Sequence, residues 1–579
     1  MTDAAKTGLL AVACLAALAT SMTVTAQPVQ THLLTAARIH TSDPQHPVAT
    51  AMAWDDAGKV LAVGDGDALL ARYPQAQRID VGNATVIPGL IDAHGHVMGL
   101  GLALMSANLV GTTSKTEVLE RLQAFEKTLA PGEWLLGGGW DQNDWVETAF
   151  PTAADLDAAF PDRPLWLERV DGHAGWANSA ALRLLAASKE GKNMLATKAW
   201  PGGQVLLDAT GSPSGILVDE AMQPMKGVLP AIDQARAQAA LQRALDAAVA
   251  NGLTGVHDMG TSRAELALFK QFADEGKLSL RIDTYADGNR DALDDLCKDG
   301  LYQHPGGRLE MRGVKLYIDG ALGSRGAALK EDYSDDPGNR GLLVTSPEEF
   351  EVAVRKAKGC GVQVATHAIG DRGNHIVLDT YQRVLGDATK GDHRWRIEHA
   401  QIVTPDEIPR FAQLGVIASM QPTHATSDMP WAQTRLGRER LEGAYAWRTF
   451  LDSGAHLALG SDFPVESPDP RLGLYAAVTR QDREGHPPGG WFPGQVLTPA
   501  EALRGFTSDA AWAGHDEAKV GSLAVGKRAD FVVLDADPLT MASSGIDDIV
   551  VRSTWVDGKA VYSRESAGKE TAALGDGKH

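Results

Sequence analysis

Short apolar, β-branched runs alternate along this chain with longer segments in which apolar residues recur at helical spacing. Segments such as Ala235–Ala250 and Pro347–Lys358 have this helical spacing and contain little Gly or Pro. The short runs predict eight parallel strands, each followed by helical sequence. The predicted strands lie near Thr85–Ala93, Thr254–Met259, Leu280–Ala286, Gly313–Asp319, Val362–His367, Arg396–Ala400, Val416–Gln421 and Leu457–Asp462.

Several of these runs end in residue types that bind metal ions. In PGLIDAHGH, His94 and His96 follow a strand-like segment, and residues two apart on a strand point to the same side. Neutral imidazole is a common zinc ligand. Lys315 lies inside a strand pattern, where a free ammonium group is costly to bury. A single residue of this kind would be interpreted as a polar side chain at a strand end with its hydrogen bonds satisfied. The chain, however, has six such residues: His94, His96, Lys315, His367, His399 and Asp462.

Over nearly its whole mature length, the sequence resembles the amidohydrolase superfamily of metal-dependent hydrolases. It is most similar to the amidohydrolase-3 or YtcJ-like branch, which includes N-substituted formamide deformylases. The resemblance rests on PGLIDAHGH, GWDQNDW, DGHAGWANS, KLYIDGALGSR, THAIGD, RIEHAQ, QPTH and GSDFPV, in this order. It implies an α/β fold, a (β/α)8 TIM barrel, whose metal ligands are His94, His96, Lys315, His367, His399 and Asp462. In such barrels the active site lies at the C-terminal ends of the strands.

The ligand set that the resemblance implies would hold two divalent metal ions, with zinc expected. Two such ions lower the pKa of a bound water toward ~7 and so provide a hydroxide nucleophile. An ammonium group cannot coordinate a metal, so we expect Lys315 to be carboxylated and to bridge the two ions. The alternative is an unmodified lysine that polarises the substrate carbonyl beside one metal. Asp462 is assigned both as a ligand and as the base that carries a proton to the leaving amine.

Other polar and aromatic residues are candidates for substrate contacts. His173 and His424 are expected to hydrogen-bond the substrate carbonyl oxygen as charge develops on it. Arg325 would pair with a substrate carboxylate, and Trp140 and Trp145 would line the pocket. For each of these, a packed or solvated loop residue is the alternative. We expect structural or surface roles for His257, Asp258, His375 and His393.

The 579 residues exceed the roughly 250 of a plain barrel, so further domains are expected. Residues 87–513 would form the barrel, and within them an insertion at 98–232, rich in Trp and Gly, would cover the substrate site. Residues 27–86 and 514–565 contain strand-like runs, with hairpin signals at Asp56–Gly58 and at Asp557–Gly558. These two segments are predicted to form one small β-sandwich, and residues 566–579 a tail.

The first residues have the pattern of an export signal. Lys6 precedes the apolar run Gly8–Ala19, and Val24–Ala26 is a small-residue cleavage site, which predicts a signal peptide over residues 1–26. A membrane anchor is the alternative, but the run is short for a spanning helix of ~20 residues. We therefore expect a periplasmic or secreted protein without stable membrane insertion. Cys297 and Cys360 do not indicate a disulfide scaffold, and the sequence leaves open that they are unpaired.

A net charge of −20 argues against nucleic acid and anionic membrane surfaces as partners. We expect an exported metal-dependent amidohydrolase that cleaves a non-peptide amide, formamide or cyclic amide bond in a small molecule. One alternative is a mononuclear deaminase that keeps His94, His96, His367 and Asp462. The other is a binding protein that has lost turnover. The sequence leaves a homodimer open.

Overall fold

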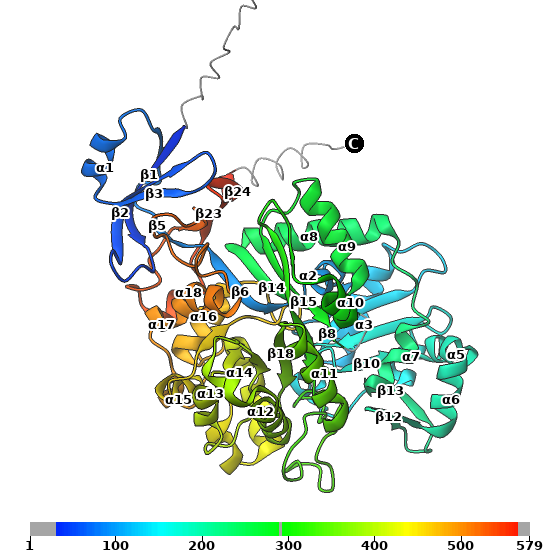
Figure 1. Ribbon diagram of the computed structural model, residues 1–579. Coiled ribbons are helices and arrows are strands. Elements are labelled where there is room, and N and C mark those ends of the chain that lie inside the picture. The colour runs from blue at the N-terminus through cyan, green and yellow to red at the C-terminus, as the bar shows by residue number, and fades with distance from the viewer. Residues whose placement is uncertain (1–29, 289–291, 566–579) are drawn as a thin grey trace, which may run out of the picture.

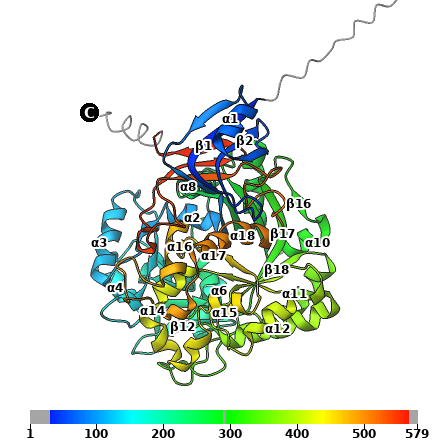
Figure 2. The same cartoon turned by 90° about the vertical axis from the view of Figure 1, so that its left-hand side faces the viewer.

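The computed structural model describes residues 30–288 and 292–565 (Figure 1). The predicted signal peptide, with Cys14, and the predicted tail at 566–579 lie outside the described residues. Within them, a central barrel is flanked on different sides by a small sheet and by the insertion at 98–232, as the two views show (Figures 1 and 2).

The barrel has eight parallel strands that neighbour one another in chain order. Backbone hydrogen bonds close the ring between its last and first strands: Asp462 N donates to His94 O at 2.7 Å, and His96 N donates to Phe463 O at 2.8 Å. The predicted (β/α)8 barrel is thereby confirmed. Its strands are β6 (Leu90–Gly95), β14 (Leu253–Thr261), β15 (Arg281–Asp287), β17 (Leu309–Tyr317), β18 (Gln363–Ala368), β19 (Arg396–His399), β20 (Ile417–Met420) and β21 (Leu457–Leu459), with the short β16 (Tyr302–Gln303) paired to β17.

The first predicted strand is in fact two strands. Residues Thr85–Pro88 form β5, which belongs to the small flanking sheet, and the barrel strand β6 begins at Leu90. Gly89 separates them at a point of close packing, because a Cβ atom there would lie 2.1 Å from Thr254 Oγ1. The continuous apolar run in the sequence therefore hides a transfer of the chain from one sheet to another.

Helices cover the outside of the barrel and follow its strands. The predicted Ala235–Ala250 helix is observed as α8, which Asp233 caps by accepting a hydrogen bond from Arg236 N. The predicted Pro347–Lys358 helix is α11, which begins with a capping box formed by Ser346 and Glu349. The helices are α2 (Val97–Ala103), α8 (Gln234–Ala250), α9 (Arg263–Asp274), α10 (Ala292–Asp299), α11 (Pro347–Gly359), α12 (Asp371–Leu385), α13 (Ile408–Leu414), α14 (Pro422–Leu436), α15 (Trp447–Asp452), α16 (Pro470–Thr479), α17 (Pro499–Gly505) and α18 (Ser508–Ala513).

The insertion folds around a seven-stranded sheet of its own. Trp140, Trp145 and Trp176 pack against one another in its core, with ring centroids 5.7–6.3 Å apart. The strands lie in the order β11 (Ala199–Trp200), β12 (Gly203–Leu207), β13 (Pro213–Asp219), β10 (Ala174–Ala177), β9 (Leu165–Arg169), β8 (Leu135–Trp140) and β7 (Ala107–Asn108). The helices are α3 (Lys115–Glu126), α4 (Ala153–Asp157), α5 (Ser179–Ala187), α6 (Lys189–Thr197) and α7 (Gln223–Lys226).

Segments from both ends of the chain form the small flanking sheet. Strand β22 pairs antiparallel with β5, and this pairing joins the C-terminal segment to the N-terminal one. Positive φ angles at Asp557 and Gly558 make the tight turn predicted there. The strands are β1 (Thr31–His40), β2 (Val48–Asp55), β3 (Val60–Gly64), β4 (Gln77–Asp80), β5 (Thr85–Pro88), β22 (Phe531–Leu534), β23 (Val551–Val556) and β24 (Lys559–Ser563), with α1 (Gly66–Arg72) between β3 and β4.

Cys297 and Cys360, which the sequence left open as unpaired thiols, form a disulfide. Their Cα atoms lie 5.1 Å apart although 63 positions separate them in the sequence. Cys297 lies on α10 and Cys360 caps the end of α11, and these neighbouring helices bring the two thiols together.

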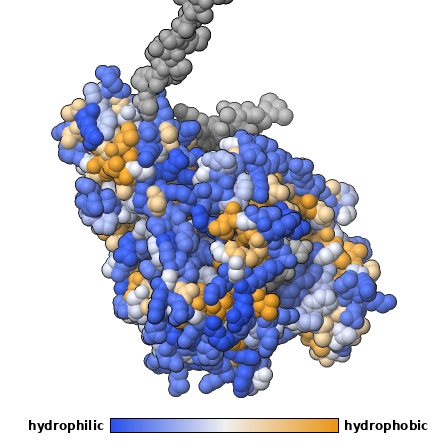
Figure 3. Space-filling model, viewed as in Figure 1, coloured by the Kyte–Doolittle hydropathy of each residue, from blue (hydrophilic) through white to orange (hydrophobic). Residues whose placement is uncertain are grey.

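The face seen in Figure 3 is mostly hydrophilic, with hydrophobic residues in separate groups. Among the described residues, every helix is too short or too polar to span a bilayer.

Candidate metal centre

The six residues predicted to bind metal meet at the C-terminal ends of the barrel strands. His94 and His96 lie at the end of β6, Lys315 on β17, His367 on β18, His399 on β19, and Asp462 just after β21. The ring centroids of His94 and His399 are 4.9 Å apart, and those of His367 and His399 are 4.6 Å apart. Residues that are distant in sequence therefore surround one small volume.

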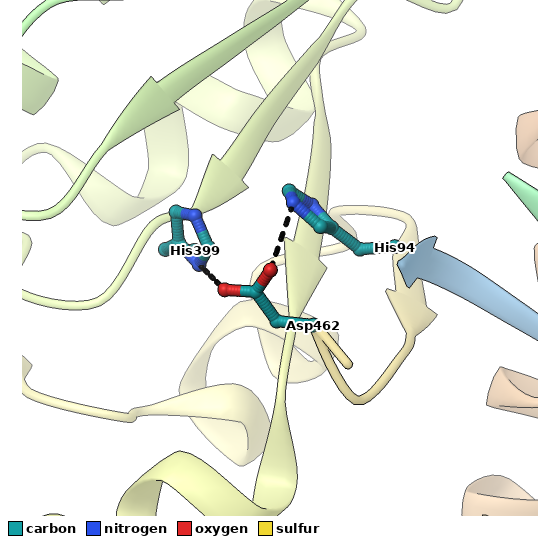
Figure 4. A group of neighbouring side chains, drawn as sticks. All are labelled: His94, His399 and Asp462. Atoms are coloured by element: carbon teal, nitrogen blue, oxygen red, sulfur yellow. Dashed lines mark ion pairs between the residues drawn. The ribbon is translucent and has the colours of Figure 1, made fainter. Parts of the chain in front are cut away.

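Asp462 lies between the histidines (Figure 4). Its Oδ1 is 3.5 Å from His94 Nε2 and 3.1 Å from His96 Nε2, and its Oδ2 is 3.9 Å from His399 Nδ1. His94, His399 and Asp462 each offer one ligand atom within 4.8 Å of the others. Asp462 Oδ1 is also buried without a hydrogen-bond partner among the described residues. Imidazoles, a carboxylate and an unsatisfied buried oxygen fit a divalent metal.

Hydrogen bonds to Nδ1 assign the tautomers of three histidines. His94 Nδ1 is 2.6 Å from Glu398 Oε2, and His96 Nδ1 is 2.8 Å from Met259 O. His399 Nδ1 is 2.8 Å from Gln421 Oε1. Since these oxygens only accept hydrogen bonds, each Nδ1 carries a proton, and in a neutral ring the lone pair is then on Nε2. This is the arrangement commonly found in histidines that bind metals.

Burial keeps the histidines neutral. It lowers the pKa of His94 to about 4, with the charge of Lys315 as a second cause, and it lowers the pKa of His367 and of His399 well below 6.5. For Asp462, burial alone would raise the pKa, but the nearby His94, His96 and His399 hold it well below its usual value. At neutral pH His94, His367 and His399 are thus neutral and Asp462 is ionised. These are the forms that coordinate metals.

Lys315 faces the same volume from the barrel interior. Its Nζ lies 3.1 Å from His94 Nε2, and its side chain is almost fully buried. Burial lowers the pKa of Lys315 to about 8. A substantial fraction of the amine is therefore neutral near physiological pH, which is the nucleophilic form.

Two of the ligand-type residues have left-handed backbone conformations. The φ angle is 72° at His399 and 63° at Asp462, values that non-glycine residues seldom adopt. Such strain is concentrated at functional sites, where the surrounding structure holds it. It also explains how Glu398 and His399, which are adjacent on β19, can both contact His94 instead of pointing to opposite faces.

His173 and His424 flank this centre. The His173 ring comes from the insertion and lies 5.2 Å from the His367 ring, with Nδ1 2.6 Å from Asp219 Oδ1. His424, in the first turn of α14, stacks on His399 with a centroid distance of 5.9 Å. Its Nε2 is buried, has no hydrogen-bond partner among the described residues, and lies 3.9 Å from Asp462 Oδ2. Both histidines are therefore close enough to act on a substrate held at the centre.

Arg325 and Trp140, which were predicted to contact the substrate, both have partners within the protein. Arg325 Nη2 pairs with Asp335 at 2.9 Å, and this carboxylate occupies the guanidinium group. Trp140 is fully buried in the core of the insertion and donates its Nε1 proton to Leu167 O. Trp145 is in the same core. Trp140 and Trp145 are thus packed core residues of the insertion, the alternative given above for them.

Sequence reasoning missed Glu398, the buried carboxylate that contacts His94. The signal was present in RIEH, because Arg396 and Glu398 are two apart on a strand and so point to the same side. A charged pair of this kind within a buried strand indicates a paired interior site. His257, for which a structural or surface role was expected, lies inside the barrel next to Arg396.

Comparisons with known proteins agree with this geometry. A model of the amidohydrolase family matches residues 77–562. The putative amidohydrolase YtcJ of Bacillus subtilis is 32% identical over 514 residues, which cover 88% of this chain and 95% of the relative. The N-substituted formamide deformylase of Arthrobacter pascens is 29% identical, over 91% of this chain and 97% of the relative. The crystal structure of an uncharacterized metal-dependent hydrolase from Pyrococcus horikoshii has a TM-score of 0.70 and 29% identity, and the match covers 89% of this chain and 99% of that one.

Proposed function

The chain belongs to the amidohydrolase family, and we propose that it hydrolyses a carbon–nitrogen bond other than a peptide bond in a small molecule. An N-acyl, formamide or cyclic amide group is the proposed substrate, and the relative named as an N-substituted formamide deformylase supports this class. Water adds to the carbonyl carbon, the carbon–nitrogen bond breaks, and a carboxylic acid and an amine result.

The observation that carries this proposal is the meeting of His94, Lys315, His399 and Asp462 at one end of the barrel. The separation between His94 Nε2 and Lys315 Nζ is 3.1 Å, and that between His94 Nε2 and Asp462 Oδ1 is 3.5 Å. Barrel enzymes hold their reacting groups at this end of the strands. The fold itself does not select a substrate, so the proposal depends on these side chains.

We propose that the site holds two divalent metal ions, with zinc as the expected metal. The residues that would hold them are His94, His96, Lys315, His367, His399 and Asp462. Bound metal of this kind polarises a carbonyl group and makes water acidic enough to attack at neutral pH. The neutral imidazoles and the ionised Asp462 described above are suited to this role.

For Lys315 we propose carboxylation, in which the neutral amine attacks carbon dioxide, forms an N–C bond and loses one proton. The product is an anion that can bridge two metal ions, which an ammonium group cannot do. Burial of the Lys315 amine and its pKa of about 8 support this reaction, because only the neutral amine is nucleophilic.

The remaining groups handle protons and the substrate oxygen. Asp462 accepts a proton from the attacking water and returns it to the leaving nitrogen. His173 stabilises the carbonyl oxygen as it becomes negative, and Asp219 behind it favours the protonated imidazole. His424 lies on the other side of Asp462 and offers its unpaired Nε2 to the substrate.

A substrate panel tests the proposal. Metal-loaded protein would be incubated with N-acyl amino acids, N-substituted formamides, cyclic imides and peptides, and amine release measured. We expect turnover of one of the first three classes and none of the peptides. Release of ammonia from an aminated ring, with no amide cleaved, would contradict the proposal and favour a deaminase.

A site with one metal is the second candidate. His94, His399 and Asp462 converge closely enough to hold a single ion. In that case Lys315 stays unmodified and polarises the substrate carbonyl. The number of metal ions per chain distinguishes the two candidates.

We also propose that the protein is exported to the periplasm or secreted. The sequence pattern of residues 1–26 supports export. The Cys297–Cys360 disulfide gives a second reason, because such bonds persist mainly in oxidising compartments. Fractionation of producing cells, with detection of the chain beginning near Gln27, tests this proposal. Full-length protein confined to the cytoplasm would contradict it.

A further inference from the structure

A buried ion pair lies inside the barrel directly behind His94. Arg396 and Glu398 have no exposed surface, and Arg396 Nη2 lies 3.0 Å from Glu398 Oε2. The same carboxylate oxygen lies 2.6 Å from His94 Nδ1. Arg396 therefore connects to a metal-site histidine through one shared acceptor.

The guanidinium group of Arg396 also contacts strands across the barrel interior. Each of these contacts uses a guanidinium N–H, since arginine only donates hydrogen bonds. The acceptors come from four strands other than β19, namely Ala93 O on β6 at 2.5 Å, His257 Nδ1 on β14 at 2.9 Å, Tyr285 OH on β15 at 3.4 Å and Ser419 Oγ on β20 at 2.6 Å. Each of the three guanidinium nitrogens of Arg396 has at least one hydrogen-bond acceptor, and these contacts hold the planar group in one orientation.

This fixed guanidinium group determines how Glu398 faces His94. One oxygen of Glu398 accepts from Arg396 Nε, and the second accepts from both Arg396 Nη2 and His94 Nδ1. A carboxylate held in this way can only accept from His94, so the ring must carry its proton on Nδ1. The Nε2 lone pair then points away from Glu398, on the side where Lys315 and Asp462 lie.

We propose that Glu398, oriented by Arg396, is a positioning residue that fixes the tautomer and ring orientation of His94 for metal binding. This inference rests on the proposed metal site but assigns a role that the site ligands alone do not require. The charge of the carboxylate matters as well as its shape, because an ionised acceptor forms a stronger bond to the ring N–H than a neutral one. A neutral replacement should therefore weaken metal binding while leaving the ligands in place.

The test compares Glu398→Gln with Glu407→Gln. Glu407 is also a buried glutamate, but it pairs with Lys330, Arg410 and His375, none of which is a proposed metal ligand. Zinc affinity would be measured by competition with a chromogenic chelator, and the stability of each metal-free protein by thermal unfolding. We expect roughly 10–100-fold weaker zinc binding for Glu398→Gln, the usual effect of losing an outer-shell partner, and unchanged binding for Glu407→Gln.

Equal zinc affinity in Glu398→Gln and the parent protein would overturn the inference while leaving the proposed function intact. Absence of zinc binding in the parent protein would instead contradict the proposed function itself. If Glu398→Gln fails to fold, histidine-ring nitrogen NMR of the zinc-loaded parent protein still decides the matter. A His94 signal with the proton on Nδ1 is expected, and a proton on Nε2 would overturn the inference.

Discussion

His173 Nδ1 lies 2.6 Å from Asp219 Oδ1, and this pair brings an imidazole of the insertion to the metal centre. Asp219 is buried and has a φ angle of 51°, a strained conformation for a non-glycine residue. Gly320 and Gly326 leave room for its carboxylate, since a Cβ at either position would come within 2.7 Å of an Asp219 oxygen. The loop after β17 is thus shaped around this carboxylate.

Asp219→Asn should lower activity and shift its pH dependence. Burial favours the neutral form of His173, but Asp219, together with the charges of Asp171 and Asp462, outweighs this effect and raises the pKa of His173. Removing the charge lowers that pKa, so His173 loses its proton at lower pH. If the protonated ring stabilises the substrate oxygen, the basic limb of kcat/KM moves to lower pH, and turnover at neutral pH falls ~10-fold or more.

The control for this variant is Asp208→Asn, which changes an exposed aspartate of the same insertion. It should keep the parent pH profile, and both variants should keep full metal content. A pH profile of Asp219→Asn that matches the parent would show that His173 does not act as a charged group.

Metal content gives a second prediction. Protein purified without chelator should contain ~2 divalent ions per chain, as a two-metal hydrolase requires. Lys315→Ala should lose metal and activity together, and small carboxylates such as formate should partly restore both by taking the place of the bridge. Lys270→Ala, which changes a lysine on the outer helix α9, should keep the metal content and the activity of the parent protein. Full metal content with lost turnover in Lys315→Ala would indicate a free lysine that acts on the substrate.

Asp462→Asn tests the proton carrier. The amide is isosteric with the carboxylate and can remain near the metal site, but it cannot accept and return a proton. We expect normal folding and a loss of ~100-fold or more in turnover, the typical contribution of a positioned acid–base group. Metal analysis and steady-state kinetics of the same preparation check this. Near-normal turnover with the metals in place would shift the proton-transfer role to His173 or His424.

Loss of the disulfide should destabilise the protein. The bond closes a long loop, with 63 positions between its cysteines, and that loop includes strand β17 with Lys315. The chain-entropy model gives a loop of this length about 4 kcal/mol of stabilisation. We expect reductant, or the double change Cys297→Ser and Cys360→Ser, to lower the unfolding midpoint in denaturant. The double variant should itself be insensitive to reductant, and a parent protein that is equally insensitive would mean that the bond does not form.

The sequence determined the barrel and the group of metal-site residues. Each ligand-type residue lies within or directly after a local apolar run, and the carboxyl ends of parallel strands in a barrel all meet at one face. Local patterns were therefore enough to bring His94, His96, Lys315, His367, His399 and Asp462 together. The helices α8 and α11 were predicted for the same reason, since their caps and apolar spacing are local features.

The tertiary structure alone decided which distant groups touch. His94 contacts Glu398, 304 positions away in the sequence, and Cys297 forms a disulfide with Cys360. Arg325 forms an ion pair with Asp335. The tertiary structure also placed Trp140 in the core of the insertion and divided one apolar run between β5 and β6 at Gly89. These outcomes depend on packing between segments that are far apart in the chain. Residue type and local spacing do not predict which distant partner a side chain contacts after such packing.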